Sequence, residues 1–155
     1  MFTWLENTPV AIWVGVSLWG YPLLLSLHVI GLAVVVGIFA TRDLRLLGLF
    51  PGLHPAAFLP LGKLGWIGFI INALSGILLF TSQAVTFANN TAFLIKISCI
   101  VVGMVLAGLI QSRLRGELAA SRDQVSISSS TRLIALCSLT VWAAAIIAGR
   151  LIAYL

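Results

Sequence analysis

Charged residues are scarce in this chain of 155 residues. Only 8% of the residues are Asp, Glu, Lys or Arg, against about a quarter in an ordinary soluble domain, whereas 61% are hydrophobic. Acidic residues are the rarest class, with four against nine basic ones. Several apolar runs exceed the roughly 18–20 residues that cross a bilayer. The composition therefore excludes an ordinary soluble domain and predicts an integral membrane protein.

Several catalytic motifs are absent as well. The sequence contains no HExxH, no CxxC and no CxxCH for covalent haem, and its Ser and His residues show no triad pattern. We therefore do not expect a water-activating hydrolase, nor an enzyme that acts on its own. The net charge of +5 comes from basic residues beside the apolar runs, without a stripe of Arg and Lys interleaved with aromatic residues. No nucleic-acid partner is expected.

Four apolar segments predict four membrane-spanning helices, at residues 20–41, 63–86, 91–112 and 132–153. Residues 1–19 precede them, with three tryptophans and a helix start at Thr8-Pro9. Because tryptophan favours the membrane interface, we expect this segment to form a short interfacial helix. The predicted fold class is all-α: an integral membrane four-helix bundle over residues 20–155, with a short N-terminal interfacial helix.

The loops predict the orientation of the bundle. The two long loops and their edges carry seven basic residues: Arg42, Arg45, Lys63, Arg113, Arg115, Arg122 and Arg132. The N-terminal segment and the turn FANNTAF, on the other side, carry none. The positive-inside rule then places both long loops in the cytoplasm and both termini in the periplasm of a bacterial inner membrane. Asp43 is expected to pair with Arg42 or Arg45, or to cap a loop helix, at the cytoplasmic edge.

The two long loops differ in character. The first, GLFPGLHPAAFLPLGK, contains three prolines and is not expected to form one regular helix. Its apolar side chains indicate that it lies along the membrane surface; they are Phe50, Leu53, Phe58 and Leu59. The second is polar and rich in serine, and either Ser130 or Thr131 is expected to cap the last span.

His28 is an ionisable residue inside the first predicted span, in YPLLLSLHVIGLAVVVG. At 1.5 Å per residue it lies about 12 Å below the outer end of that helix. Ionisable side chains at such a depth usually face the bundle interior or a cavity. Gly31, on the same helix face, leaves room for a flat group beside the ring. Two interpretations stay open: a neutral histidine that hydrogen-bonds to a neighbouring helix, or the ligand of a cofactor metal.

Lys96 and Arg150 are also expected in the outer half of the membrane. Each alone is explained by a long side chain that reaches back to the interface. Together with His28 they predict an electropositive region, since no Asp or Glu falls in any predicted span. An anionic ligand would complete the set. Haem b fits, because imidazole binds iron and basic side chains bind propionates; a quinone head group or an acidic partner chain would also fit.

The second predicted span carries a stripe of small and polar residues at helical spacing: Gly65, Gly68, Asn72, Ser75 and Gly76. Such stripes are typical of close helix packing in membranes. The alternative is that the stripe makes room for a flat cofactor, and for this reason Asn72 and Ser75 join the candidate cofactor-binding residues. His54 lies in the first long loop, too far from His28 to bind the same iron across a core of about 30 Å. A second axial histidine would come from a second copy or a partner.

The order of these segments resembles a bacterial inner-membrane family of unknown function with four spans. The resemblance covers residues 3–110 and rests on SLWGYPLLLSLHVIGLAVVVG, RDLRLLG, LGWIGFIINALSGILLF and NNTAFLIK. The residues that carry it are Trp19, Tyr21-Pro22, His28, Gly31, Asp43-Leu44-Arg45, Ser75-Gly76 and Lys96. It implies the topology and little about activity. A weaker resemblance to small b-type cytochromes and to copper-resistance membrane proteins implies histidines within a four-helix bundle, although this chain lacks a second intramembrane histidine.

These observations favour an integral inner-membrane subunit that binds haem b or another redox cofactor in the outer half and serves electron transfer. We expect it to contact membrane lipid and either other membrane or periplasmic subunits or further copies of itself. The alternative is a non-redox accessory or scaffold subunit, in which His28 hydrogen-bonds within the bundle. A third interpretation is a small transporter of a metal ion or anion.

Overall fold

The computed structural model describes residues 2–120 and 127–154 and confirms the all-α fold. Four helices are long and apolar enough to cross a membrane: α3 (Gly20–Leu46), α4 (Phe58–Thr81), α6 (Thr91–Ala120) and α7 (Ser129–Leu151). The shorter helices are α1 (Thr3–Glu6), α2 (Pro9–Val16), the 3-10 turn η1 (Pro55–Ala57) and α5 (Ala84–Asn89). The chain is thus a multi-pass membrane protein, with two short N-terminal helices instead of the single one expected.

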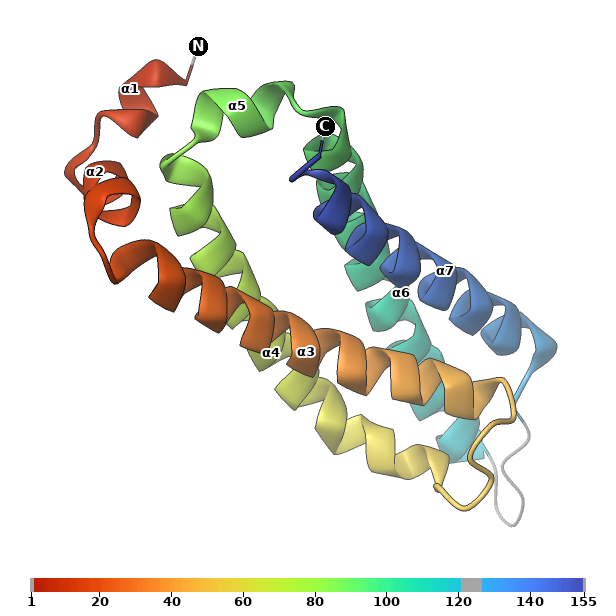
Figure 1. Cartoon of the computed structure of the whole chain (residues 1–155). Coiled ribbons are helices and arrows are strands. Elements are labelled where there is room, and N and C mark those ends of the chain that lie inside the picture. The colour runs from red at the N-terminus through yellow and green to blue at the C-terminus, as the bar shows by residue number, and fades with distance from the viewer. Residues whose placement is uncertain (1, 121–126, 155) are drawn as a thin grey trace.

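The four long helices pack as two antiparallel pairs, α3 with α4 and α6 with α7 (Figure 1). The pairs meet through the second half of α3, which packs against α6 and α7. Toward the end that carries both termini the backbones of the two pairs diverge (Figure 1), and there α4 and α6 meet through the stacked rings of Phe80 and Phe93. The bundle is therefore closed at one end and spread at the other.

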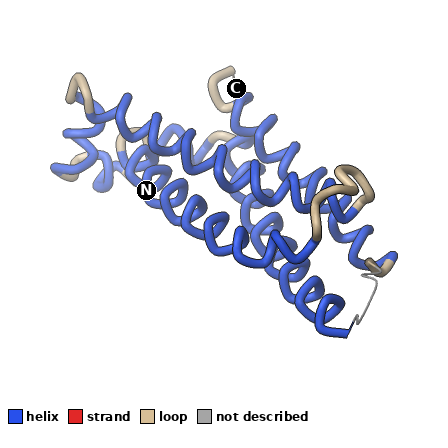
Figure 2. The backbone as a smooth tube through the Cα atoms, turned by 90° about the horizontal axis from the view of Figure 1, so that it is seen from below, coloured by secondary structure: helices blue, strands red, loops and turns tan. Residues whose placement is uncertain are grey.

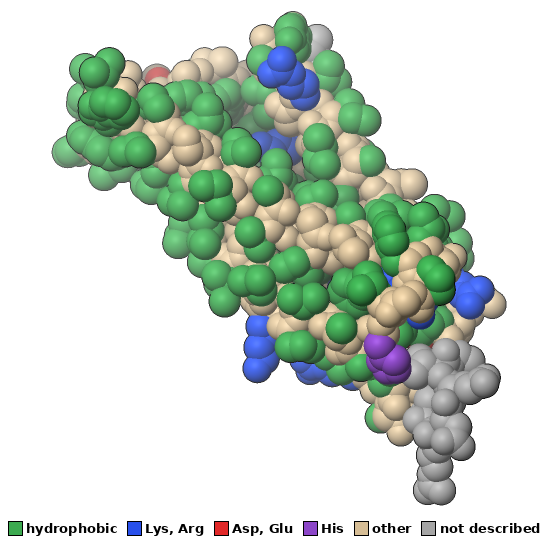
Figure 3. Space-filling view, turned by 60° about the horizontal axis from the view of Figure 1, so that its bottom comes forward, with side chains coloured by type: hydrophobic (Ala, Val, Ile, Leu, Met, Phe, Trp, Pro, Cys, Tyr) green, Lys and Arg blue, Asp and Glu red, His purple; other side chains and the backbone are tan. Residues whose placement is uncertain are grey.

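The two ends of the bundle also differ in the segments that they carry. Both termini, α1, α2 and α5 lie at the spread end, and the α3–α4 loop lies at the closed end (Figures 1 and 2). Hydrophobic side chains cover much of the flank, and several Lys and Arg side chains gather toward the closed end (Figure 3). This is the arrangement that the loop charges predict, apart from Arg122, which lies outside the described residues.

Two apolar clusters form the core of the closed half. One joins α3 to α6 and α7 through Val35, Phe39, Met104, Ala107 and Trp142. The other lies nearer the loops and consists of Leu46, Phe58, Ile110, Leu114 and Ala135. Many other apolar side chains are exposed on the surface of the long helices, where lipid would cover them. The clusters therefore stabilise the pairing of helices through close packing more than through exclusion of water.

The long helices run past several of the predicted boundaries. Helix α3 continues to Leu46 instead of residue 41, and α6 continues to Ala120 instead of residue 112. Helix α4 begins earlier than expected, at Phe58, and ends at Thr81, so that α5 is a separate helix. Hydropathy marks only the apolar part of a helix, whereas the backbone hydrogen bonds continue into the polar residues at its ends.

The expectation that Phe58 lies on the membrane surface is wrong. Its side chain is only 4% exposed and packs in the second apolar cluster, beside Leu46. The helix can start here because Pro60 falls in its first turn, where the missing N–H is tolerated. Phe50 and Leu53 are exposed, as the sequence predicts for a loop at the membrane surface.

The helix caps are partly those expected. The predicted start at Thr8 is confirmed, since Thr8 Oγ1 accepts a hydrogen bond from the Ala11 N–H at 3.3 Å. The cap of the last span was predicted at Ser130 or Thr131, and this is wrong. Ser128 caps α7, accepting a hydrogen bond from the Thr131 N–H at 3.2 Å.

Candidate functional site

The ring of His28 projects from α3 onto α4. Its Nδ1 lies 2.9 Å from the carbonyl oxygen of Asn72, and the Asn72 side-chain amide donates back to the carbonyl of His28 at 2.8 Å. Ser75 Oγ lies 3.3 Å from the same ring nitrogen and donates its own proton to Ile71 O at 2.7 Å. Because the carbonyl oxygen can only accept, the shorter contact favours a proton on Nδ1, whereas the Asn72 side-chain nitrogen, 3.3 Å from the same atom, would donate to it in the other tautomer. With the proton on Nδ1, the lone pair of a neutral ring is on Nε2, which makes no hydrogen bond within the described part of the chain.

Close contact between α3 and α4 makes this pairing possible. A Cβ at Gly31 would lie 2.7 Å from the Asn72 backbone nitrogen and 2.9 Å from the Gly68 carbonyl. A Cβ at Gly65 would lie 2.8 Å from the Phe39 ring. These glycines thus serve helix packing, the first interpretation of the stripe. The space beside Gly31 is occupied by α4, so no room remains there for a flat group.

Gly76 is the exception, because it lies beside the imidazole. A Cβ there would come within 2.9 Å of His28 Cε1. Next to it opens a cavity of about 530 Å³, lined by side chains from α3, α4, α5 and α6. Its polar lining residues are Tyr21, His28, Asn72 and Lys96.

The structure brings some of the predicted site residues together and separates others. His28, Asn72 and Lys96 line the same cavity, His28 from the α3–α4 pair and Lys96 from α6. Ser75 is buried behind the ring. Arg150 is exposed and outside the cavity: its guanidinium donates to the Tyr154 hydroxyl at 3.2 Å and lies over that ring at 5.5 Å.

No carboxylate of the described residues lines the cavity. Glu6 accepts a hydrogen bond from the Val85 N–H at 2.9 Å, and Glu117 accepts from Ser128 and Thr131. The remaining described acid, Asp43, belongs to the closed end of the bundle, and Asp123 lies outside the described residues. The ammonium group of Lys96 therefore has no acidic counter-ion in the part of the chain that the structure describes.

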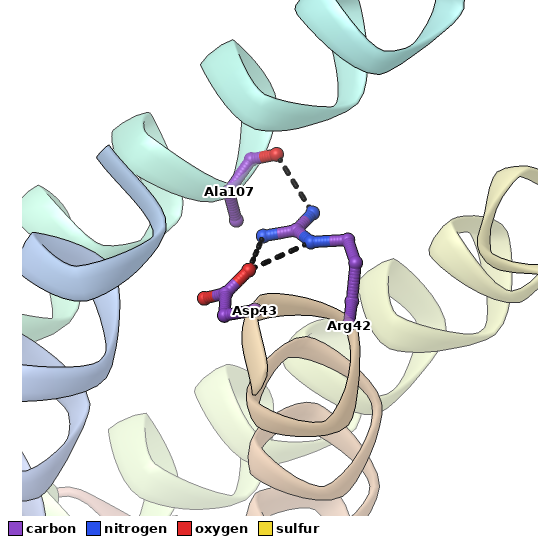
Figure 4. A network of polar contacts seen from close by, with 3 residues as sticks. All are labelled: Arg42, Asp43 and Ala107. Carbon is purple, nitrogen blue, oxygen red and sulfur yellow. Dashed lines mark hydrogen bonds and ion pairs between the residues drawn. The ribbon is translucent and has the colours of Figure 1, made fainter. Parts of the chain in front are cut away.

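Arg42 and Asp43 form a buried ion pair that the sequence only partly predicted (Figure 4). The Arg42 Nε and Nη2 atoms lie 2.9 and 2.8 Å from Asp43 Oδ1, and Nη1 donates to the Ala107 carbonyl at 3.1 Å. The pairing of Asp43 with Arg42 is as expected. The expected position of both residues in a loop after the first span is wrong, because they lie in α3 and their side chains are 1% and 0% exposed. Arg45 instead donates to the carbonyl of Leu53.

The sequence did contain a signal for this burial. Arg42 follows Val35 and Phe39 at helical spacing and precedes Leu46, and all four are buried on one face of α3. The guanidinium lies over the Phe39 ring at 5.0 Å, and that ring stacks on Trp142. The pair therefore extends the apolar core and fastens α3 to α6.

His54 lies at the loop end, as expected. It is exposed, and its Nδ1 accepts a hydrogen bond from the Ala56 N–H at 3.2 Å, at the start of η1. Within the described residues, no group of three or more His, Cys, Asp or Glu side chains is placed to hold a metal ion. A metal at His28 would thus have one histidine ligand from this chain.

Comparisons with known proteins identify the family and nothing further. No curated protein and no solved structure matches the chain. A family model matches residues 1–155, which extends past residue 110, where the resemblance seen in the sequence stops, and includes the last span. The chain therefore belongs to DUF6644, a family of unknown function.

Proposed function

We propose that this protein is a membrane subunit that holds haem b, or another redox cofactor containing a metal, in the outer-half cavity and serves electron transfer. The observation that supports the proposal is the orientation of the His28 ring. In the tautomer that the 2.9 Å contact with the Asn72 carbonyl favours, Nδ1 carries the proton and the Nε2 lone pair is available to bind a metal, in a ring that lines the cavity. Metal-binding histidines commonly donate their other N–H to a carbonyl in this way.

The rest of the cavity suits such a group. Gly76 lets the imidazole pack closely against α4 beside the cavity, and the cavity volume of about 530 Å³ lies within the usual range of cofactor sites. Lys96 would bind a propionate through a charge-assisted hydrogen bond. When bound, the iron would supply exchange of a single electron. Arg150, which pairs with Tyr154 outside the cavity, has no part in this proposal.

A second axial histidine would come from outside this chain. The sequence has two histidines, and His54 lies at the opposite end of the bundle from the cavity. The other axial position would thus be open, or filled by a partner subunit or a second copy. The need for a histidine from another chain is what one expects of a protein that forms part of a larger assembly in the lipid bilayer.

The test is a dithionite-reduced minus oxidised spectrum of the protein, purified in mild detergent from haem-supplemented cells. We expect a Soret and α-band pair that disappears in His28→Ala. His54→Ala is the matched control, since it removes the other histidine without touching the cavity, and it should keep the bands. Full haem content in His28→Ala, or a flat spectrum from the unaltered protein, would overturn the proposal.

The second candidate is a non-redox accessory or scaffold subunit. The reciprocal hydrogen bonds between His28 and Asn72, at 2.9 and 2.8 Å, favour it, because they give the half-buried histidine a packing role without any ligand. This candidate predicts a colourless protein that co-purifies with a stoichiometric membrane or periplasmic partner. A monodisperse protein without a partner would contradict it.

We also propose that the spread end faces the periplasm of a bacterial inner membrane. The described basic loop residues at the closed end support this orientation through the positive-inside rule. Alkaline phosphatase fused to the C-terminus should then be active, whereas a phosphatase fused in the α3–α4 loop should be inactive. The reverse pattern would refute the orientation.

A further inference from the structure

One side of the cavity is open on the flank of the bundle. Ile77 of α4 and Ile97 and Val101 of α6 line the cavity, yet they are 60%, 42% and 58% exposed. A side chain that is both lining and exposed marks an opening. All three are apolar, and α4 and α6 diverge toward the end of the bundle that carries the termini (Figure 1). Leu25 of α3 also lines the cavity and is 41% exposed, so the opening lies between the α3–α4 pair and the α6–α7 pair.

The opening lies at the depth of the lipid chains. Ile77 is four residues before the end of α4, and Val101 is ten residues after the start of α6. At 1.5 Å per residue these positions are about 6 and 15 Å from the outer helix ends. Half of a hydrocarbon core is about 15 Å thick. In the orientation proposed above, the opening therefore faces the outer leaflet of the bilayer.

Aromatic side chains cover the end of the cavity that faces the outer solution. Phe80, Phe87 and Phe93 all line it, and their ring centroids lie 5.5–6.4 Å apart in a stack. Helix α5 crosses from α4 to α6 above them (Figure 1), and α1 is fastened to it by the hydrogen bond from the Val85 N–H to Glu6. Access from water is thus obstructed, while access from lipid is not.

The polar and charged groups that line the cavity indicate which head group its ligand would carry. Apart from the polar groups of Tyr21, His28, Asn72 and Lys96, the lining is apolar, and no described carboxylate reaches it. An ammonium group in a medium of low dielectric is stabilised by an opposite charge. An occupant with an apolar body and an acidic head group provides both contacts.

We propose that the cavity is loaded sideways from the outer leaflet, between the α3–α4 pair and the α6–α7 pair, by an acidic amphiphile whose head group pairs with Lys96. The proposal rests on the proposed function in taking this cavity as the ligand site, and haem b belongs to the same chemical class. The sideways route also applies to a ligand without a metal, so the haem proposal can be refuted while the route and the acidic head group are confirmed.

The route is tested by spin labelling in liposomes. After Cys99→Ala and Cys137→Ala, a nitroxide is placed at Ala73→Cys, which lines the cavity, or at Leu74→Cys, the adjacent lipid-facing position at the same depth. Both labels should collide more with dissolved oxygen than with a water-soluble nickel chelate. A label at residue 73 that favours the nickel chelate, while the label at residue 74 favours oxygen, would overturn the route.

The head group is tested with a spin-labelled stearic acid and its uncharged methyl ester as probes. We expect the acid to be immobilised by the protein about tenfold more strongly, the scale of one charge-assisted contact. Lys96→Gln should abolish the preference, Lys96→Arg should restore it, and Arg150→Gln is the control that should leave it unchanged. Equal immobilisation of acid and ester would overturn the proposal. Acid binding by a protein without haem bands would overturn only the haem proposal.

Discussion

Replacing one partner of the Arg42–Asp43 pair should destabilise the bundle more than replacing both. The Asp43→Ala change leaves the Arg42 guanidinium, 1% exposed, with its single bond to the Ala107 carbonyl. The Arg42→Met change leaves the Asp43 carboxylate without its cation. Removing one member of a buried ion pair costs about 3–5 kcal/mol, because the other charge stays buried without compensation.

The double variant should be milder. Arg42→Met combined with Asp43→Leu removes both charges and leaves apolar side chains between Phe39 and Ala107, an exchange that is often close to neutral in free energy. A positive coupling of several kcal/mol between the two sites is therefore expected. Arg45→Met is the control: Arg45 is only half-buried and is not part of the pair, so its change should cost about 1 kcal/mol or less.

The assay is thermal unfolding in mild detergent, with denaturant titration as the second measurement. At ~2–4 °C per kcal/mol for a chain of this size, each single variant should lower Tm by roughly 6–20 °C. The double variant should recover most of that loss. Single variants that unfold like the unaltered protein, or a double variant as unstable as the worse single one, would refute the view that the pair compensates two buried charges.

Three further predictions follow from contacts between helices. Gly31→Val should lower the free energy of unfolding by about 1–3 kcal/mol, because the valine side chain would meet the α4 backbone. Gly37→Ala is its control and should be neutral or slightly stabilising, because nothing lies within 4 Å of the added methyl group; thermal unfolding compares the two variants. Ser128→Ala should cost about 1 kcal/mol through loss of the α7 cap, measured in the same way. Glu6→Ala should release α1 from α5 and speed amide exchange at Val85; unchanged exchange would contradict the contact.

Local composition predicted the four spans, but not where their helices end. A span needs only length and apolarity, and both are visible in a short window of sequence. Helix α3 continues past residue 41 because the charges of Arg42 and Asp43 are satisfied within the bundle, in part by the Ala107 carbonyl, 65 residues away. A hydropathy window cannot detect a partner at that distance.

For the candidate site, too, the sequence predicted what depends on position along one helix, but not what depends on packing between helices. The depth of His28 and the polar stripe around Asn72 follow from position along each helix, and they pointed to residues that do meet. That Lys96 joins them and Arg150 does not depends on how α6 and α7 are turned in the bundle. For Arg150 a local clue existed, since Tyr154 lies four residues later in the sequence, just past the end of α7, and accepts its hydrogen bond.

The closed half of the bundle supplies a counter-ion for its buried basic side chain, whereas the described part of the spread half does not. In the closed half, Arg42 pairs with its neighbour Asp43, 2.8 Å away, so the chain itself supplies the counter-ion. In the spread half, Lys96 lines an open cavity that no described carboxylate reaches. A single Asp or Glu in the lining would provide a counter-ion, yet the described lining contains neither. Because an uncompensated charge within a membrane is expensive, we infer that its counter-ion arrives with a ligand.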